Sequence, residues 1–298
     1  MQHIPVLLEE AVTGLCIENG DVVLDATLGY GGHSAEISRR YGKEVTQYGN
    51  DLDDDAIIVA KKIIKESGGS VTIIKGNFRH IADVLKKNGV MQVNRVLFDL
   101  GINSAQLDSS GRGFTFMRDE PLVMTLESKP NDETITAYDV VNSWSEETLA
   151  DIIYAYGEER FARRIARVIV ENRKKHKIET TFQLVECVKE AIPKKLQIGR
   201  INPATKTFQA IRIAVNDELG SLRDALLKIT AMLAPRGRIA VISFHSLEDR
   251  IVKLFIKEQE KNGIFKIVTK KPIVPTREEV LKNPRSRSAK LRIAEKIQ

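Results

Sequence analysis

A short run of glycines shortly after an acid is the feature of this sequence most suited to chemistry. Gly29, Gly31 and Gly32 fall between an apolar run that ends at Asp25 and the start of a helical pattern. Glycine reaches positive φ and lets the backbone approach a ligand where a Cβ would collide. The first N–H groups of a helix also favour an anionic group. The pattern predicts a loop that holds a small charged ligand, although a tight strand-to-helix connection would have the same glycines.

Two acids downstream end predicted strands in the same way. Asp51 lies near the end of the predicted strand 45–52, and Asp99 near the end of the predicted strand 93–100. An acid at the tip of the second strand of a doubly wound sheet accepts hydrogen bonds from ribose hydroxyls. Alone, Asp51 would be read as a solvated cap before Asp53. Its position relative to the glycines favours a nucleoside ligand instead.

The elements that must position these residues form an α/β pattern. Further strands are predicted at 71–74 and 238–244, with a helix at 54–66 after the second strand. In an open α/β sheet, ligands bind outside the carboxyl ends of the strands, so these loops converge on one crevice. A final pair, 265–268 and 289–294, predicts an antiparallel hairpin at one sheet edge, closed by the loop 270–288. This order is typical of a seven-stranded methyltransferase sheet, whereas a dehydrogenase sheet is typically all parallel.

The middle of the chain predicts helices without strands between them. Ser145 is a candidate cap for a helix at 146–156, and further helices are predicted at 158–175 and 181–191. We therefore expect an inserted, all-helical, substrate-binding domain at 134–206, with the core formed by 1–133 and 207–298. A long helical run is predicted at 205–233.

Composition indicates a globular enzyme. The chain has 298 residues, of which 42% are hydrophobic, so a sizeable core is available. No apolar run approaches the roughly 20 residues of a membrane span, and early acids argue against a signal peptide, so we expect a cytoplasmic protein without a membrane partner. Cys16 and Cys187 lack CxxC spacing, so neither a disulfide framework nor a metal site is expected. Both are predicted to be small buried hydrophobes.

The distribution of charge indicates a polyanionic partner. The net charge is +6, and basic residues gather in 160–177, 194–206 and 266–296. Such patches suit a phosphate backbone, although many charge clusters are solvated surface only. Several aromatic residues near these patches could stack an RNA base, with a core role as the alternative, above all for Trp144 and Phe161. They are Phe114, Phe116, Trp144, Phe161 and Phe208.

Long motifs then run almost from end to end of the chain. They are HIPVLLEE from His3, DATLGYGGHS from Asp25, FDLGINSAQLD from Phe98, GRGFTF from Gly111, YGEERFARRIA from Tyr156, NPATKTFQAIRIAVNDEL from Asn202, ISFHSLEDRIVK from Ile242 and NPRSRSAKLR from Asn283. In this order they resemble the bacterial 16S ribosomal RNA cytosine-N4 methyltransferases. The resemblance implies a class I, Rossmann-like fold that uses S-adenosylmethionine to methylate a cytidine in the decoding region of the small ribosomal subunit.

The resemblance also implies site residues. It places the cofactor against Gly31, Gly32, His33, Asp51, Phe78, Asp99 and Gln106. In this interpretation the glycine loop meets the methionine carboxylate, Asp51 binds the ribose, Phe78 flanks adenine, and Asp99 lies near the transferring methyl group. His33 could instead cap its helix, and Gln106 could be an ordinary loop residue.

Methyl transfer to the exocyclic N4 of cytosine needs alignment and a hydrogen-bond acceptor near the amino group. Asp99 and Asn103 occupy the position of the acceptor loop of amino-methyltransferases, although the usual Pro-Pro-aromatic sequence is absent. His245 is another candidate, with a structural hydrogen bond as the alternative. Phe114 or Phe116 could hold an extruded base. The basic residues expected to contact RNA are Arg112, Lys206, Arg285 and Arg287.

The chain departs from the family pattern at two places. Val123 and Thr125 stand where relatives usually have an acid and an arginine, and Asn202 and Lys206 stand where they have histidine and arginine. At the first place, a structural ion pair of the family could have been replaced here by an apolar residue, Val123, and a hydroxyl residue, Thr125. Alternatively, the loss of the acid and the arginine could alter RNA specificity or reduce the rate.

Two other classes of protein stay open at this point. A nicotinamide-dependent oxidoreductase would share the glycine loop but bind a dinucleotide. A non-catalytic RNA-binding assembly factor would bind RNA without methyl transfer. A homodimer is compatible with the sequence.

Overall fold

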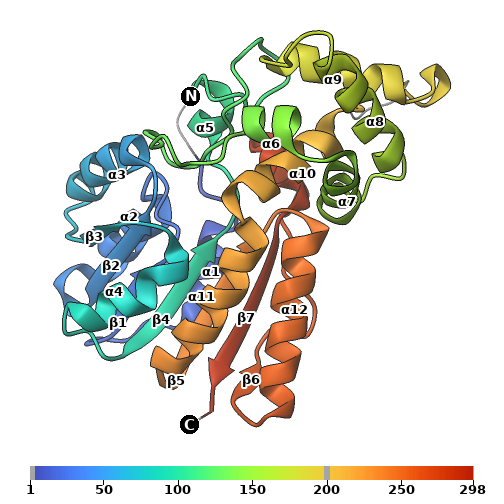
Figure 1. The fold of residues 1–298 in the computed structure, drawn as a ribbon. Helices are drawn as coiled ribbons and strands as arrows, with labels where there is room; N and C mark the ends of the chain where they lie inside the picture. Colours follow the sequence, from blue (N-terminus) through green and yellow to red (C-terminus); the bar gives the residue numbers. More distant parts are fainter. Residues whose placement is uncertain (1–3, 198–201, 298) are drawn as a thin grey trace. The chain divides into compact units, whose positions relative to one another are not determined.

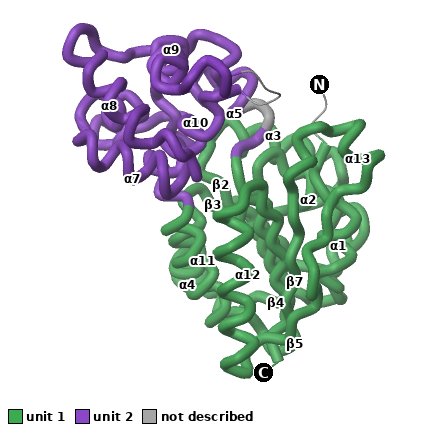
Figure 2. Tube along the Cα trace, turned by 90° about the vertical axis from the view of Figure 1, so that its right-hand side faces the viewer, with its two compact units in different colours: residues 1–101, 219–298 green, residues 102–218 purple. Residues whose placement is uncertain are grey.

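The chain divides into two compact units. The computed structural model describes residues 4–197 and 202–297. The first unit comprises 1–101 and 219–298, and the second comprises 102–218 (Figure 2). In sequence, the second unit begins earlier and ends later than the expected insertion 134–206. The reason is packing, because Phe114, Leu122 and Phe208 belong to the same buried cluster as the central helices.

Among the described residues of the first unit, seven strands form one sheet in the order β3-β2-β1-β4-β5-β7-β6 (Figure 1). β1 to β5 are parallel, and β7 lies antiparallel between β5 and β6. The strands are β1 (Val22–Asp25), β2 (Thr46–Asp51), β3 (Thr72–Lys75), β4 (Val93–Asp99), β5 (Leu233–Ser243), β6 (Phe265–Ile267) and β7 (Lys290–Lys296). This order confirms the predicted seven-stranded class I methyltransferase sheet with an antiparallel pair at its end.

Helices cover both faces of this sheet (Figure 1). They are α1 (Leu8–Leu15), α2 (Gly32–Tyr41), α3 (Asp54–Glu66), α4 (Ile81–Lys87), α11 (Glu218–Met232), α12 (Ser246–Lys261) and α13 (Arg277–Lys282), with the 3₁₀ turns η1 (Gly42–Glu44), η2 (Phe78–His80) and η4 (Pro284–Ser288). Side chains of β4 alternate between two buried clusters. Val96 and Phe98 pack with α4, α11 and α12, whereas Leu97 packs with α1 and α2. This alternation is the period of a strand buried on both faces.

The second unit is helical. Its elements are α5 (Ser104–Asp108), α6 (Ala137–Ser143), α7 (Glu146–Gly157), α8 (Ala162–Arg173), α9 (Thr181–Ala191), α10 (Thr205–Asn216) and the 3₁₀ turn η3 (Lys194–Leu196). Thr136, Ser145 and Thr180 accept hydrogen bonds from backbone N–H groups at the starts of α6, α7 and α9. These caps satisfy amides that have no partner within the helix. Ser145 therefore has its predicted role.

Three details differ from expectation. The predicted helical run 205–233 is broken at Asp217, which has φ 43°, a left-handed conformation that ends α10. The predicted loop 270–288 contains α13 and η4. Cys16 is exposed, whereas Cys187 is buried as expected, and burial raises the pKa of the Cys187 thiol to about 11.

Among the described helices, none combines the length and apolar character that crossing a membrane requires.

Candidate functional site

Three acids end neighbouring parallel strands of the first unit. Asp25 ends β1, Asp51 ends β2 and Asp99 ends β4. β1 pairs with both other strands, and Asp25 is opposite Gly49 of β2 and Leu97 of β4. The three carboxylates therefore share the carboxyl edge of the sheet, where ligands bind in open α/β folds.

The glycine loop crosses the same edge, between β1 and α2. Gly29 has φ 52° and Gly31 has φ 76°, both in the left-handed region. A Cβ at Gly31 would also lie only 3.1–3.2 Å from the side chains of Ala60 and Ile64. Glycine at these positions is therefore required by the turn itself. A Cβ at Gly32 would lie 2.3 Å from Pro5 Cγ, so this glycine makes room for the N-terminal segment.

Asp51 holds the glycine loop. Its Oδ2 accepts a hydrogen bond from the Gly29 N–H at 2.7 Å, and its Oδ1 accepts one from the Asp53 N–H at 2.9 Å. Burial raises the pKa of the Asp51 carboxyl, and these N–H groups oppose that rise. Each carboxylate oxygen can accept more than one hydrogen bond. Asp51 can therefore order the loop and still accept hydrogen bonds from ribose hydroxyls.

Asp25 is a buried acid that sequence reasoning did not single out as a site residue. Its Oδ2 accepts a hydrogen bond from Ser34 Oγ at 2.8 Å, and its Oδ1 accepts one from the Thr27 N–H at 3.3 Å. Burial raises the pKa of Asp25 to about 6. The signal for this role was its position at the end of the apolar run, shortly before the glycines.

Asp99 is a partly exposed acid with one buried carboxyl oxygen. Its side chain is 21% exposed, and Oδ2 lies 3.7 Å from Nδ1 of His33. Within the described part of the chain, the buried Oδ1 has no hydrogen-bond partner. Burial raises the pKa of Asp99 well above its ordinary value, and the carboxylates of Asp25 and Glu248 raise it further. A buried carboxyl oxygen without a partner is unfavourable, so a cationic or hydrogen-bond-donating ligand would stabilise it.

His33 and Phe78 lie near this edge. The His33 ring is buried in the first turn of α2, and its Nε2 lies 3.2 Å from the carbonyl oxygen of Val6. Gly31, not His33, is the N-cap residue of α2. Phe78 begins η2 after β3, is half-buried, and packs edge-on against Phe98 with ring centroids 5.9 Å apart.

Asn103 and Gln106 bind each other in the second unit. The Gln106 side-chain oxygen accepts a hydrogen bond from the Asn103 N–H at 3.0 Å, and the Asn103 side-chain oxygen accepts one from the Gln106 N–H at 2.8 Å. This reciprocal arrangement is that of a capping box. The predicted catalytic role of Asn103 thus competes with a cap that uses its side-chain oxygen.

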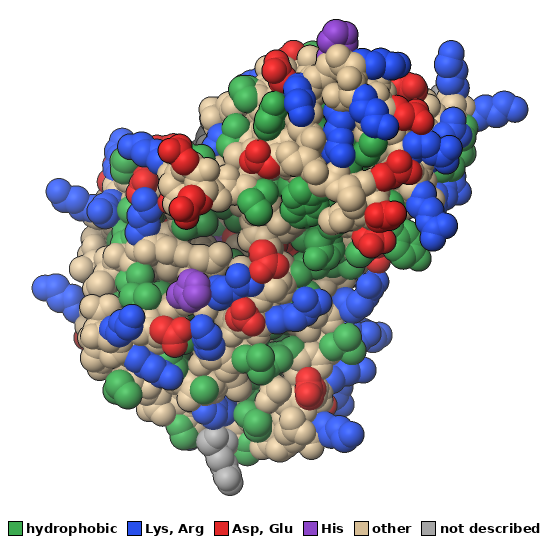
Figure 3. Space-filling model, in the orientation of Figure 1, with side chains coloured by type: hydrophobic (Ala, Val, Ile, Leu, Met, Phe, Trp, Pro, Cys, Tyr) green, Lys and Arg blue, Asp and Glu red, His purple; other side chains and the backbone are tan. Residues whose placement is uncertain are grey.

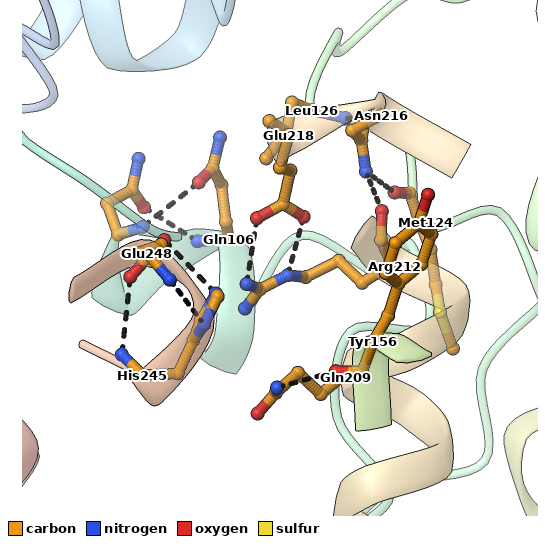
Figure 4. Close-up of polar contacts among 11 residues, drawn as sticks. Gln106, Met124, Leu126, Tyr156, Gln209, Arg212, Asn216, Glu218, His245 and Glu248 are labelled. Carbon is orange, nitrogen blue, oxygen red and sulfur yellow. Dashed lines mark hydrogen bonds and ion pairs between the residues drawn. The ribbon is translucent and has the colours of Figure 1, made fainter. Parts of the chain in front are cut away.

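His245 also acts at a helix start. Its Nδ1 accepts a hydrogen bond from the Glu248 N–H at 3.3 Å, and Glu248 Oε2 accepts hydrogen bonds from the backbone N–H groups of Phe244 and His245 (Figure 4). These contacts form a capping box at the start of α12. His245 thus makes the structural hydrogen bond that was the alternative to a catalytic role.

The predicted substrate residues of the second unit are mostly in structural positions. Phe114 is 6% exposed within the helical core, which is the core role that the sequence left open as the alternative to base stacking. Phe116 is half-buried and packs edge-on against Phe208. Buried Arg112 donates hydrogen bonds to the carbonyl oxygens of Thr125 and Leu126, both at 2.9 Å. Among the predicted aromatic stackers, Trp144 and Phe161 pack partly buried against the same core.

Three predicted cations are exposed. Lys206 donates a hydrogen bond to the Glu158 carbonyl oxygen at the end of α7, at 2.8 Å. Arg285 and Arg287 lie exposed in η4 of the first unit. Exposure leaves these residues accessible to a polyanion.

Sequence comparison decides the family. A model of the MraW methylase family matches residues 1–297. The chain belongs to the MraW methylase family. The methylase is 46% identical to the ribosomal RNA small subunit methyltransferase H of Paenibacillus sp. (strain JDR-2), with 99% of both chains covered. It is 44% identical to the enzyme of the same name from Brevibacillus brevis, with 99% of this chain and 98% of the relative covered.

The methyl donor of this methylase is S-adenosylmethionine. The residues at the carboxyl edge fit it. Its sulfonium and ammonium groups are cationic, and the edge presents the carboxyls of Asp51 and Asp99, including an oxygen that no described residue hydrogen-bonds. The glycine loop and the start of α2 suit its carboxylate. Family membership excludes the oxidoreductase alternative.

Proposed function

We propose that this methylase transfers a methyl group to the exocyclic N4 of a cytidine in the decoding region of 16S ribosomal RNA. The named relatives act on the RNA of the small ribosomal subunit. S-adenosylmethionine supplies an activated methyl group on a sulfonium. Asp51, the glycine loop and Phe78 hold the donor, and Asp99 acts at the acceptor.

The proposal depends mainly on the environment of Asp99 Oδ1. The N4 lone pair of cytosine is delocalised into the ring, so the amino group is a weak nucleophile. An acceptor that binds an N4 hydrogen draws the lone pair out of conjugation and can then take the proton. Asp99 offers, at the carboxyl edge, a buried oxygen with no hydrogen-bond partner in the described part of the chain, whereas the Asn103 oxygen is used to cap α5. Asp99 is therefore the catalytic residue of the proposal.

The surface of α8 supports an RNA partner. Arg163, Arg164 and Arg167 are exposed on this helix at spacings that share one face. Among the described residues, no acidic side chain pairs with them. Lys and Arg side chains are numerous on the surface of the helical unit (Figure 3). Unneutralised cations on one face suit phosphate groups.

The deciding experiment uses small ribosomal subunits from cells that lack this methylase. They are incubated with the purified protein and methyl-labelled S-adenosylmethionine, and the labelled nucleotide is mapped. We expect label on N4 of one cytidine in the decoding region. Label on another base would contradict the cytidine assignment, and binding of donor and subunit without transfer would identify a non-catalytic assembly factor.

Asp99 variants test the assigned role. Asp99→Ala should lower single-turnover methyl transfer by roughly 100-fold or more, since it removes both the acceptor and the proton carrier, while RNA affinity changes little. Asp99→Asn keeps the shape but not the basicity and should be similarly slow. Equal losses of RNA affinity and of rate would contradict a role at the reacting amino group.

A further inference from the structure

The N-terminal segment fixes the tautomer of His33. A backbone carbonyl can only accept a hydrogen bond, so the contact of 3.2 Å between Val6 O and Nε2 places the ring proton on Nε2. In the neutral ring, Nδ1 then carries the lone pair, and it is this atom that lies 3.7 Å from Asp99 Oδ2.

The C-terminal part of the first unit holds that segment in place. The Leu7 N–H donates a hydrogen bond to Glu279 Oε1 of α13 at 2.8 Å. Asn283 Nδ2, just after α13, donates one to the carbonyl oxygen of Ile4 at 3.2 Å. Val6 lies between these two anchor points. The acceptor for His33 is therefore positioned by residues that are remote in sequence.

His33 Nδ1 and Asp99 Oδ2 repel each other unless one of them carries a proton. A neutral Nδ1 and an ionised carboxylate both present lone pairs, and the two side chains are only 6% and 21% exposed. Water therefore screens their repulsion poorly. The charged groups that act on Asp99 from other elements are the carboxyls of Asp25 on β1 and Glu248 on α12. Both are acidic, so in the free protein they favour the neutral acid form of Asp99.

We propose that His33 and Asp99 share one proton, which passes from Asp99 Oδ2 to His33 Nδ1 when the cationic methyl donor binds. The Oδ2–H bond breaks and an Nδ1–H bond forms, so the pair as a whole neither gains nor loses a proton. The positive charges of S-adenosylmethionine stabilise the carboxylate form of Asp99. His33 is thus a positioning residue that acts through Asp99 and prepares it to accept the N4 hydrogen, a consequence that rests on the proposed function.

The geometry allows this transfer after a small movement. A charge-assisted N–H···O hydrogen bond is about 2.7–2.9 Å long, so the two atoms must approach by about 1 Å from 3.7 Å. Asp99 Oδ1 has no partner among the described residues. The carboxyl group can therefore rotate toward His33 without breaking a side-chain hydrogen bond.

Nitrogen-15 NMR of the histidine rings tests the transfer on the intact wild-type protein. The His33 signals are identified by their loss in His33→Asn. In the free protein we expect a proton on Nε2 and none on Nδ1. Addition of S-adenosylmethionine should protonate Nδ1, and Asp99→Asn should abolish that change. An Nδ1 that stays unprotonated when wild type is saturated with S-adenosylmethionine would overturn the proposal.

Calorimetry counts the proton independently. S-adenosylmethionine binding is measured near neutral pH in buffers of different ionisation enthalpy. Wild type should release almost no net proton, since His33 retains it, whereas His33→Asn should release about one proton as Asp99 ionises. The double variant His33→Asn, Asp99→Asn should release none. If His33→Asn releases no proton, the assignment is refuted. It is also refuted if the double variant still releases a proton, which would identify Asp25 as the source.

Neither measurement involves RNA. An error in the target nucleotide would therefore leave both results unchanged, and failure of the proton transfer would leave the cytidine assignment intact.

Discussion

The three acids at the carboxyl edge of the sheet have different partners and therefore different chemistry. Asp51 is bound by two backbone N–H groups, Asp25 by a hydroxyl and a backbone N–H, and Asp99 has an oxygen with no partner among the described residues. Asp51 thus orders a loop, Asp25 orients the start of α2, and Asp99 can act on a ligand.

Asp51→Ala should weaken S-adenosylmethionine binding by roughly 10- to 100-fold. Hydrogen bonds to a charged group contribute about 1.5–3 kcal/mol, and the variant removes both the ribose contact and the tie to Gly29. The dissociation constant is measured by calorimetry. Asp54→Ala, which removes a carboxylate paired with Lys75, is the matched control. Unchanged affinity in Asp51→Ala would refute the ribose role.

Asp25 should make stability depend on pH. Burial raises its pKa from 3.8 to about 6, so between these values the folded state binds more protons than the unfolded state. The free energy of unfolding contributed by Asp25 is therefore fully present below about pH 4 and falls as pH rises through about 6. Asp25→Asn removes this dependence.

Urea unfolding of wild type and Asp25→Asn measures that effect. Between about pH 4 and pH 7, wild type should lose on the order of 3 kcal/mol more stability than the variant. Parallel pH profiles for the two proteins would show that Asp25 is ionised throughout.

At the scale of elements, the altered segment around Val123 is held by the end of α10. Asn216 donates a hydrogen bond to the Met124 carbonyl oxygen, and its own side-chain oxygen accepts one from the Leu126 N–H, both at 2.8 Å (Figure 4). Thr125 is 1% exposed and donates a hydrogen bond to the Glu127 carbonyl oxygen. These contacts favour the interpretation that the departures at Val123 and Thr125 are structural replacements.

Asn216→Ala should destabilise the protein by about 2 kcal/mol. It leaves a carbonyl and an N–H without partners in a partly buried place, and an unmade hydrogen bond there is unfavourable by about 1–3 kcal/mol. The free energy of unfolding in urea checks this. Asn131→Ala, in an exposed turn, should change it by less than about 0.5 kcal/mol. Equal effects would show that Asn216 does not hold the segment.

At the scale of the whole molecule, the net charge of +6 matters less than where cations lie. If α8 contacts phosphates, the triple change of Arg163, Arg164 and Arg167 to Ala should weaken RNA binding. It should also reduce the slope of log affinity against log salt concentration by about 2. Each phosphate contact to single-stranded RNA contributes about 0.7 to that slope, and three contacts would be lost. Binding to a decoding-region RNA is measured at several salt concentrations.

A matched control has the same change of charge. Lys61, Lys62 and Lys65 are three exposed cations of α3, and their replacement by Ala removes an equal net charge. If both triple variants lose the same affinity and the same slope, the effect is non-specific and α8 is not a phosphate-binding face.

Local signals predicted most of the fold. Apolar strand segments, caps such as Ser145 and the antiparallel final pair depend on residues close together in sequence, so the sheet and most helices were predictable. The break at Asp217 was not, because a continuous helical pattern carries no sign of one left-handed residue. The edge of the helical unit at 102 was missed because Phe114 and Leu122 join its core only through tertiary packing.

The sequence by itself determined the family, the methyl donor and the acids at the strand ends, because long motifs and strand-end acids are properties of neighbouring residues. Only the tertiary structure decided what each side chain does. It placed Phe114 in the core, used Asn103 and His245 as helix caps, left Asp99 Oδ1 without a partner among the described residues, and brought Val6 to His33. Hydrogen-bond partners and burial depend on segments remote in sequence, and no local pattern records them.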